Sequence, residues 1–176
     1  MRLLTFCPRN TDTPLLGVRI GERILNLGAA ATAAGESGIP ASMKALLAAG
    51  PQAMQRVQAL ADAAQAGDAR FAQAWVAESE IRYLPPIPDA DKFLCVGKNY
   101  RQHLEELKRT NLIREIPEEP TSFIKLNSCL AGHKEQVVIP DGVVRLDYEP
   151  ELVFVIGKRA LGVKKADAFD YVAGVT

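Results

Sequence analysis

The sequence predicts an α+β protein, with a small N-terminal α/β domain over residues 1–84 and the first part of a β-rich domain over 85–176. Three observations lead to this fold class. Short β-branched segments separated by turn residues open the chain. A stretch with apolar residues three and four positions apart follows, as in an amphipathic helix. From residue 93 onward, several short apolar runs end in glycine or proline, which is typical of strands.

The first elements form an antiparallel meander. Strands are expected over residues 3–6, 15–20 and 23–27, and Gly21 with Glu22 makes a hairpin turn between the last two. Residues 29–42 are rich in alanine, glycine and serine, and we expect them to form a loop or a frayed segment.

Two helices follow. Ser42 is the expected N-cap of a helix over residues 43–49. Gly50 ends that helix, and Pro51 suits the first turn of the next one. The second helix carries one apolar face, made of Met54, Val57, Ala61 and Ala64. Residues 1–80 show no chemical motif, so their expected role is to form a supporting core.

The domain boundary is placed at Pro85, Pro86 and Pro88, a stiff extended connector after a strand over residues 81–84. A buried strand over 93–96, a turn at 97–99 and a helix over 100–109 come next. A strand, a glycine turn and a helix in this order leave backbone N–H groups at the helix start, which is an anion-binding arrangement.

The polar segment 111–119, with Pro117 and Pro120 near its end, is expected to be a mobile loop of the kind that forms lids or binding loops. Later elements are strands over 121–126 and 137–139, a short helix over 164–172 and a strand that begins at 173.

Residues 146–157 read as a strand, and Glu149 and Glu151 would then project from the same face. Their separation along the chain would be roughly 6–7 Å at a strand rise of about 3.3 Å per residue. Two like charges held together repel, and a divalent cation that prefers oxygen ligands would remove that cost. The alternative is a pair of solvated glutamates at a strand end. The apolar run 152–156 predicts burial on both faces.

His103 and Glu106 lie three residues apart and so share one face of the helix over 100–109. A carboxylate beside an imidazole orients it, which suits a general base. The alternative is a surface ion pair of little energetic weight. Lys125 stands among apolar residues and either reaches water or meets a buried anion.

Composition excludes several partners. The chain has 176 residues, with 21 Lys and Arg against 21 Asp and Glu, so no net charge attracts nucleic acid or anionic lipid. No apolar run is long enough for a membrane span or a signal peptide. Cys7, Cys95 and Cys129 form no CxxC pair. We therefore predict reduced thiols and a cytoplasmic location.

Three motifs resemble the fumarylacetoacetate hydrolase family. They are Lys-Phe-Leu-Cys-Val-Gly-Lys-Asn-Tyr over 92–100, followed by His103 and Glu106; Phe-Ile-Lys over 123–125; and Asp-Tyr-Glu-Pro-Glu-Leu-Val-Phe-Val-Ile-Gly-Lys over 147–158. The resemblance covers about residues 81–176. The N-terminal region is also similar to the small N-terminal domain of bacterial members.

The resemblance implies a β-rich roll with an Mg²⁺ or Mn²⁺ site, with Ca²⁺ as an alternative ion. In that family, Glu149 and Glu151 match metal carboxylates, and His103 and Glu106 match the pair that activates water. Lys125 and Tyr100 match substrate-binding positions. Members usually act as homodimers on small 2-oxo or 1,3-dicarbonyl acids.

The activity implied is metal-dependent hydrolysis of a C–C bond, as in aromatic compound catabolism. Isomerase, decarboxylase, hydratase or lyase activity within the same family is the alternative. Two further possibilities are a non-catalytic truncated remnant and a binding module without turnover.

Three features depart from the family pattern. The third metal carboxylate of the family lies downstream of a segment like 171–176, where this sequence stops. Leu126 and Asn127 stand where a proline often follows the pocket lysine. Pro150, which has no N–H, indicates an edge strand or a bulge. We therefore expect residues 1–176 alone to bind metal weakly, expose apolar surface and associate.

Overall fold

The computed structural model describes residues 1–115, 118–119 and 121–176. The chain divides into two compact units, one made of Met1–Ile87 with Ala131–Thr176 and the other of Pro88–Leu130. Each unit is described by itself. None of the described helices has the length and apolar character needed to cross a membrane.

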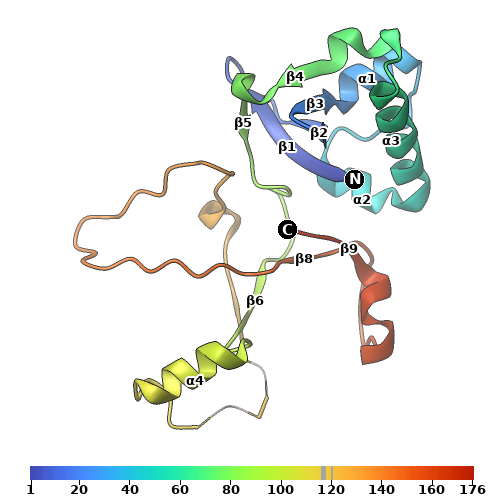
Figure 1. Cartoon of the computed structure of the whole chain (residues 1–176). Coiled ribbons are helices and arrows are strands. Elements are labelled where there is room, and N and C mark those ends of the chain that lie inside the picture. Colours follow the sequence, from blue (N-terminus) through green and yellow to red (C-terminus); the bar gives the residue numbers. More distant parts are fainter. Residues whose placement is uncertain (116–117, 120) are drawn as a thin grey trace. The chain divides into compact units, whose positions relative to one another are not determined.

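A five-stranded antiparallel sheet forms the centre of the first unit (Figure 1). Its strand order is β4-β3-β2-β1-β5. The strands are β1 (Arg2–Pro8), β2 (Leu15–Ile20), β3 (Arg23–Asn26), β4 (Trp75–Ala77) and β5 (Ile81–Tyr83). Gly21, with φ of +61°, closes the β2–β3 hairpin, a left-handed conformation that glycine adopts without strain. The predicted meander is therefore present, and two later strands extend it on either edge.

Three helices pack on this sheet: α1 (Leu27–Ala34), α2 (Met43–Ala48) and α3 (Gly50–Gln65). The Ser42 side chain accepts a hydrogen bond from the Ala45 N–H at 3.2 Å, as predicted for an N-cap. Helix α1 corrects the expectation of a loop over 29–42. Alanine favours helix strongly, and the segment has a cap at each end, Asn26 before it and Gly35 with φ of +70° after it. Two short 3₁₀ helices complete this part, η1 (Ala69–Ala74) and η2 (Glu78–Glu80).

The core lies between the sheet and the helices. Two clusters fill this layer, one around Leu46 and Val57 and one around Leu25 and Phe71, and all four side chains are at most 1% exposed. A smaller cluster covers the opposite face of the sheet and consists of Leu4, Phe6, Ile24 and Ile81. Residues 1–80 therefore form the supporting core that the sequence predicts.

The second stretch of the first unit contains β8 (Phe154–Ile156), the 3₁₀ helix η4 (Lys165–Tyr171) and β9 (Val172–Val175). The strand predicted over 146–157 is much shorter than expected. Reciprocal backbone hydrogen bonds between Val153 and Thr176 begin the pairing with β9, and residues 146–152 form no strand. A strand needs a neighbour for its N–H and C=O groups, and Pro150 has no N–H to offer. Residues 137–139, also predicted as a strand, form none.

The second unit contains the antiparallel pair β6 (Leu94–Gly97) and β7 (Thr121–Ile124), with α4 (Arg101–Arg109) between them in sequence and η3 (Asn127–Cys129) after them. The loop predicted over 111–119 lies partly outside the described residues, because 116, 117 and 120 are not among them. Its described residues belong to no helix or strand.

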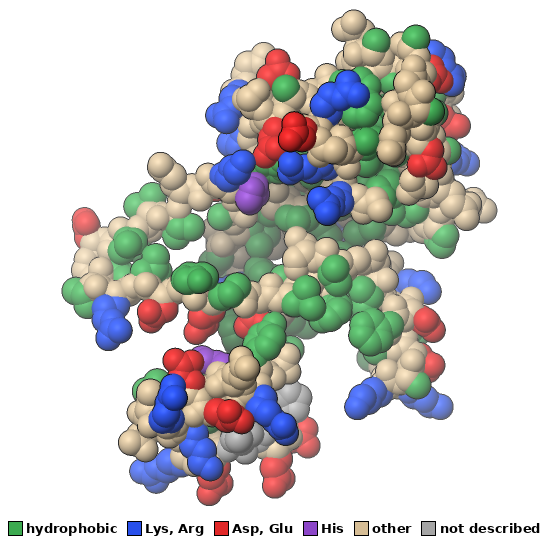
Figure 2. Space-filling view, in the orientation of Figure 1, with side chains coloured by type: hydrophobic (Ala, Val, Ile, Leu, Met, Phe, Trp, Pro, Cys, Tyr) green, Lys and Arg blue, Asp and Glu red, His purple; other side chains and the backbone are tan. Residues whose placement is uncertain are grey.

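Burial is lower than the sequence predicts in β6 and β8. Leu94 is 63% exposed, Phe154 46% and Ile156 56%, although both strands were expected to be buried. Each belongs to a two-stranded ladder, which buries far less apolar surface than a multi-stranded sheet with a helical layer. Many hydrophobic side chains accordingly lie at the surface in Figure 2. Exposed apolar surface of this kind is typical of interaction sites.

The fold predicts unequal costs for two leucine truncations. Leu46→Ala removes a fully buried side chain and should lower the free energy of unfolding by about 2–5 kcal/mol. Leu161→Ala is the control, because Leu161 is 90% exposed, and its effect should stay within about 0.5 kcal/mol. Urea unfolding followed by fluorescence of Trp75, the single tryptophan, measures both. Equal costs would contradict the assigned core.

Candidate functional site

The predicted acid–base pair lies on α4 in the second unit. His103 Nδ1 is 3.6 Å from Glu106 Oε2, and the two side chains are 41% and 61% exposed. This separation is longer than a hydrogen bond, so the contact is electrostatic. The helix spacing thus brings the two groups together as predicted, and both are accessible to a small molecule from solvent.

The turn before α4 contains an unusual backbone conformation. Lys98 has φ of +58°, which is uncommon for a residue with a side chain, whereas Gly97 has no positive φ. Gly97 instead permits close approach of the strands, since a Cβ there would lie 3.0 Å from Thr121 Oγ1. Such strained residues gather at functional sites, so Lys98 joins the candidates. The sequence does not reveal the positive φ of Lys98, because the adjacent Gly97 is the residue expected to adopt it.

Lys125 follows β7, where its N–H donates to the Phe93 carbonyl at 3.0 Å and its side chain is exposed. It therefore reaches water, one of the two alternatives that its apolar neighbours left open. Asn127, which stands where a proline was expected, donates from Nδ2 to the Ala90 carbonyl at 2.9 Å. That bond restrains the backbone after Lys125. Tyr100, the last candidate of this unit, directly precedes α4.

Glu149 and Glu151 belong to the first unit, where both are exposed and lie in a segment without helix or strand. The same-face argument for these glutamates therefore does not apply, because it required a strand. Their carboxylates are the hard oxygen ligands that Mg²⁺, Mn²⁺ and Ca²⁺ prefer. Within the described part of the chain, no three His, Cys, Asp or Glu side chains gather as a metal-binding group. The glutamates thus fit part of a cation site.

A charged cluster that the sequence did not indicate lies at Glu78. Its two carboxylate oxygens contact Arg19 and Lys134, each at 3.2 Å. Hydrogen bonds from Lys134 and Tyr83 lower the pKa of Glu78, so its contribution to stability is full above pH 4.5 and is lost as pH falls through the lowered value. Burial, followed by the bond to Glu78, raises the pKa of Tyr83. These residues are far apart in sequence, so no spacing rule could reveal the cluster.

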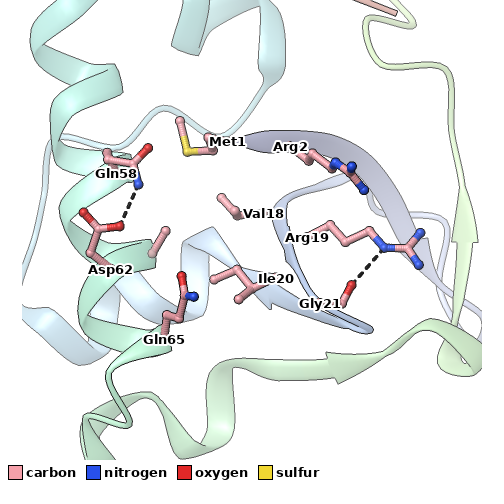
Figure 3. A pocket seen from close by; sticks show the side chains of 10 residues that line it. Met1, Arg2, Val18, Arg19, Ile20, Gly21, Gln58, Asp62 and Gln65 are labelled. Atoms are coloured by element: carbon pink, nitrogen blue, oxygen red, sulfur yellow. Dashed lines mark hydrogen bonds between the residues drawn. The ribbon is translucent and has the colours of Figure 1, made fainter.

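The first unit contains a hollow between β2 and α3 and another beside Glu78. One, of about 350 Å³, lies between β2 and α3, where Gln58, Asp62 and Gln65 face Val18 and Ile20 (Figure 3). Gln58 donates to Asp62 at 2.7 Å within it. The other, of about 450 Å³, includes the Glu78 cluster. Neither hollow is lined by the residues that the sequence marks for catalysis or metal binding.

Comparison with known proteins defines the class. Residues 92–176 match the family model described as fumarylacetoacetate (FAA) hydrolase C-terminal. Residues 92–176 belong to the fumarylacetoacetate hydrolase family, a family of enzymes.

Three relatives are similar to this chain over different lengths. The chain is 31% identical over its whole length to the mitochondrial oxaloacetate tautomerase fahd2 of Xenopus laevis, covering 50% of that protein. It is 35% identical over 140 residues to the oxaloacetate tautomerase YisK of Bacillus subtilis, covering 78% of this chain and 46% of YisK. A human mitochondrial oxaloacetate tautomerase, FAHD2A, is 39% identical over 98 residues, which is 56% of this chain and 30% of that protein. The chain thus spans at most about half the length of these relatives.

The exposure of the α4 pair predicts a small role in stability. Exposed ion pairs contribute about 0–1 kcal/mol, so His103→Ala and Glu106→Gln should each change the free energy of unfolding by less than about 1 kcal/mol. Denaturant unfolding followed by far-ultraviolet circular dichroism measures this. A larger loss in either variant would indicate that the pair is structural.

Proposed function

We propose that this chain belongs to a metal-dependent tautomerase that moves a proton on oxaloacetate or a closely related 2-oxo acid. The observation that carries the proposal is the His103–Glu106 contact on an accessible helix, in a chain whose relatives from frog, human and a bacterium are named oxaloacetate tautomerases. The sequence motifs imply C–C hydrolysis first. The names of these relatives lead us to favour the isomerase alternative instead.

The pair suits proton transfer at carbon. Tautomerisation of a 2-oxo acid removes a proton from the carbon beside the carbonyl and places one on the carbonyl oxygen. Glu106 faces Nδ1 of His103, which favours the tautomer that carries its proton there. Nε2 is then the basic nitrogen. It takes the proton from the substrate carbon and gives it to the enolate oxygen, and the same two transfers run backwards in the reverse direction.

Lys125 supplies the complementary charge. Its exposed ammonium group would bind a substrate carboxylate or stabilise the oxyanion that develops when the carbon is deprotonated. Tyr100, adjacent to the start of α4, is proposed as a second substrate contact. Both residues belong to the same unit as His103 and Glu106.

Glu149 and Glu151 would hold the proposed Mg²⁺ or Mn²⁺. When bound, such an ion supplies Lewis-acid stabilisation of the enolate. The carboxylates themselves bind the cation, and their exposure lets them do so without burying unpaired charge.

C–C hydrolysis is the second candidate, and the description of the matching family model favours it. The same His103 can deprotonate a water molecule instead of a carbon. The two reactions are separated by their products, because hydrolysis cleaves the substrate into two acids and tautomerisation leaves its carbon skeleton intact.

Assembly and location are also proposals. A homodimer is supported by the exposed apolar side chains, such as Phe154 and Ile156, which association would cover. We propose a cytoplasmic protein on the cysteine pattern, although several relatives carry the word mitochondrial in their names.

Metal binding is tested by calorimetric titration of Mn²⁺ into the purified protein. Glu149→Gln and Glu151→Gln each remove a charged ligand and should weaken binding by about tenfold or more. Asp167→Asn, an exposed acid on η4, is the control and should leave affinity unchanged. Unaltered affinity in both glutamate variants would remove the metal assignment.

Catalysis is tested with enol oxaloacetate, whose ultraviolet absorbance falls as it converts to the keto form. His103→Ala should reduce kcat by about 10²–10⁴-fold, the usual contribution of a general base. Glu105→Gln, on the neighbouring residue of α4, should stay near wild type. A loss below tenfold in His103→Ala would show that another group is the base, and release of two acids from an acylpyruvate would favour the hydrolase.

A further inference from the structure

A four-residue turn, 132–135, contacts β5 and η2 within the first unit. We call it the anchor turn. The Gly132 N–H donates to Glu135 Oε2 at 2.6 Å, and the Glu135 N–H donates to the Gly132 carbonyl at 3.0 Å. Lys134 between them has φ of +65°. The turn is therefore shaped by its own hydrogen bonds.

Gly132 seats the turn against β5. It is buried, and a Cβ built on it would overlap the Tyr83 carbonyl oxygen and lie 2.8 Å from the Tyr83 carbonyl carbon. The obstructing atoms are backbone, which cannot rotate away as a side chain can. Only glycine allows the turn to pack this closely.

The next two residues continue the contact. The His133 ring meets the Tyr83 ring edge to face, with centroids 5.2 Å apart and planes at 82°, a favourable aromatic geometry. Lys134 Nζ lies 3.2 Å from Glu78 Oε1, and Arg19 holds the other oxygen of the same carboxylate. Three successive residues of the turn thus contact the N-terminal sheet region.

The anchor turn precedes the segment that carries the two glutamates. Residues 136–153 form no helix or strand, and Glu149 and Glu151 lie within them. At the far end, Val153 pairs with Thr176 beside β8 and β9. A segment without secondary structure of its own takes its position mainly from its two ends, because each fixed end removes chain entropy.

We propose that the anchor turn fixes the N-terminal end of segment 136–153, and that Gly132, Lys134 and Glu78 are positioning residues for Glu149 and Glu151. The positioning role rests on the proposed metal function, whereas the docking of the turn does not. The packing of Gly132 against Tyr83 contributes most to holding the anchor turn in place. The Lys134–Glu78 pair adds less, because the Lys134 side chain is 69% exposed.

The test combines hydrogen–deuterium exchange with Mn²⁺ titration on the purified chain. Gly132→Ala should raise exchange of the hydrogen-bonded turn amides, at residues 132 and 135, by about tenfold, since it opens a docked turn. It should weaken Mn²⁺ binding by about tenfold as well, as loss of support behind metal ligands usually does. Gly28→Ala is the control, because that exposed residue of α1 has only Asn26 Oδ1 nearby, at 3.5 Å.

Glu78→Gln provides a second variant that keeps the backbone unchanged and should give smaller changes in the same direction. Trp75 fluorescence verifies that each variant folds. Exchange as slow as wild type in Gly132→Ala and Glu78→Gln would overturn the anchor. Faster exchange with unchanged Mn²⁺ affinity would overturn the positioning role. A wild-type chain that binds no Mn²⁺ would refute the metal proposal and with it the positioning role. The exchange rates would still show whether the anchor turn is docked on β5.

Discussion

Burial of apolar side chains between the five-stranded sheet and helices α1–α3 is the interaction on which the described structure depends. Leu27, Leu46 and Val57 are fully buried there, and removal of such surface from water is the main driving force of folding. The sheet of this layer includes β5, which pairs with β1 and whose Ile81 packs in the cluster on the opposite face. It therefore provides the firm surface that carries Glu78 and Tyr83, against which the anchor turn packs.

The candidate catalytic groups stand in a different physical situation. His103, Lys125 and the two glutamates are all partly or fully exposed, and little apolar surface is buried around them. Their chemistry accordingly depends on orientation and on mutual contact rather than on burial. The clearest contact is between His103 and Glu106, which a single turn of α4 enforces whatever the surroundings of the helix.

Tautomerisation and C–C hydrolysis draw on the same parts. Both pass through charge on an oxygen beside the reacting carbon, so a base, a bound cation and a contact to the substrate carboxylate would serve either reaction. What differs is whether a water molecule is held beside the substrate. The motif residues indicate the chemistry that the two reactions share, and none of them distinguishes one reaction from the other. The names of the relatives favour tautomerisation.

The sequence by itself determined the features that depend on neighbouring residues: the hairpin at Gly21, the cap at Ser42 and the His103–Glu106 contact. It also carried the family motifs. Helix α1 was missed although its caps are local, because alanine and glycine were read as loop. Only the tertiary structure decided that pairing begins at Val153 and that the anchor turn docks on β5. Both depend on a partner distant in the chain, since a strand requires another strand for its hydrogen bonds and a buried glycine requires an opposing backbone.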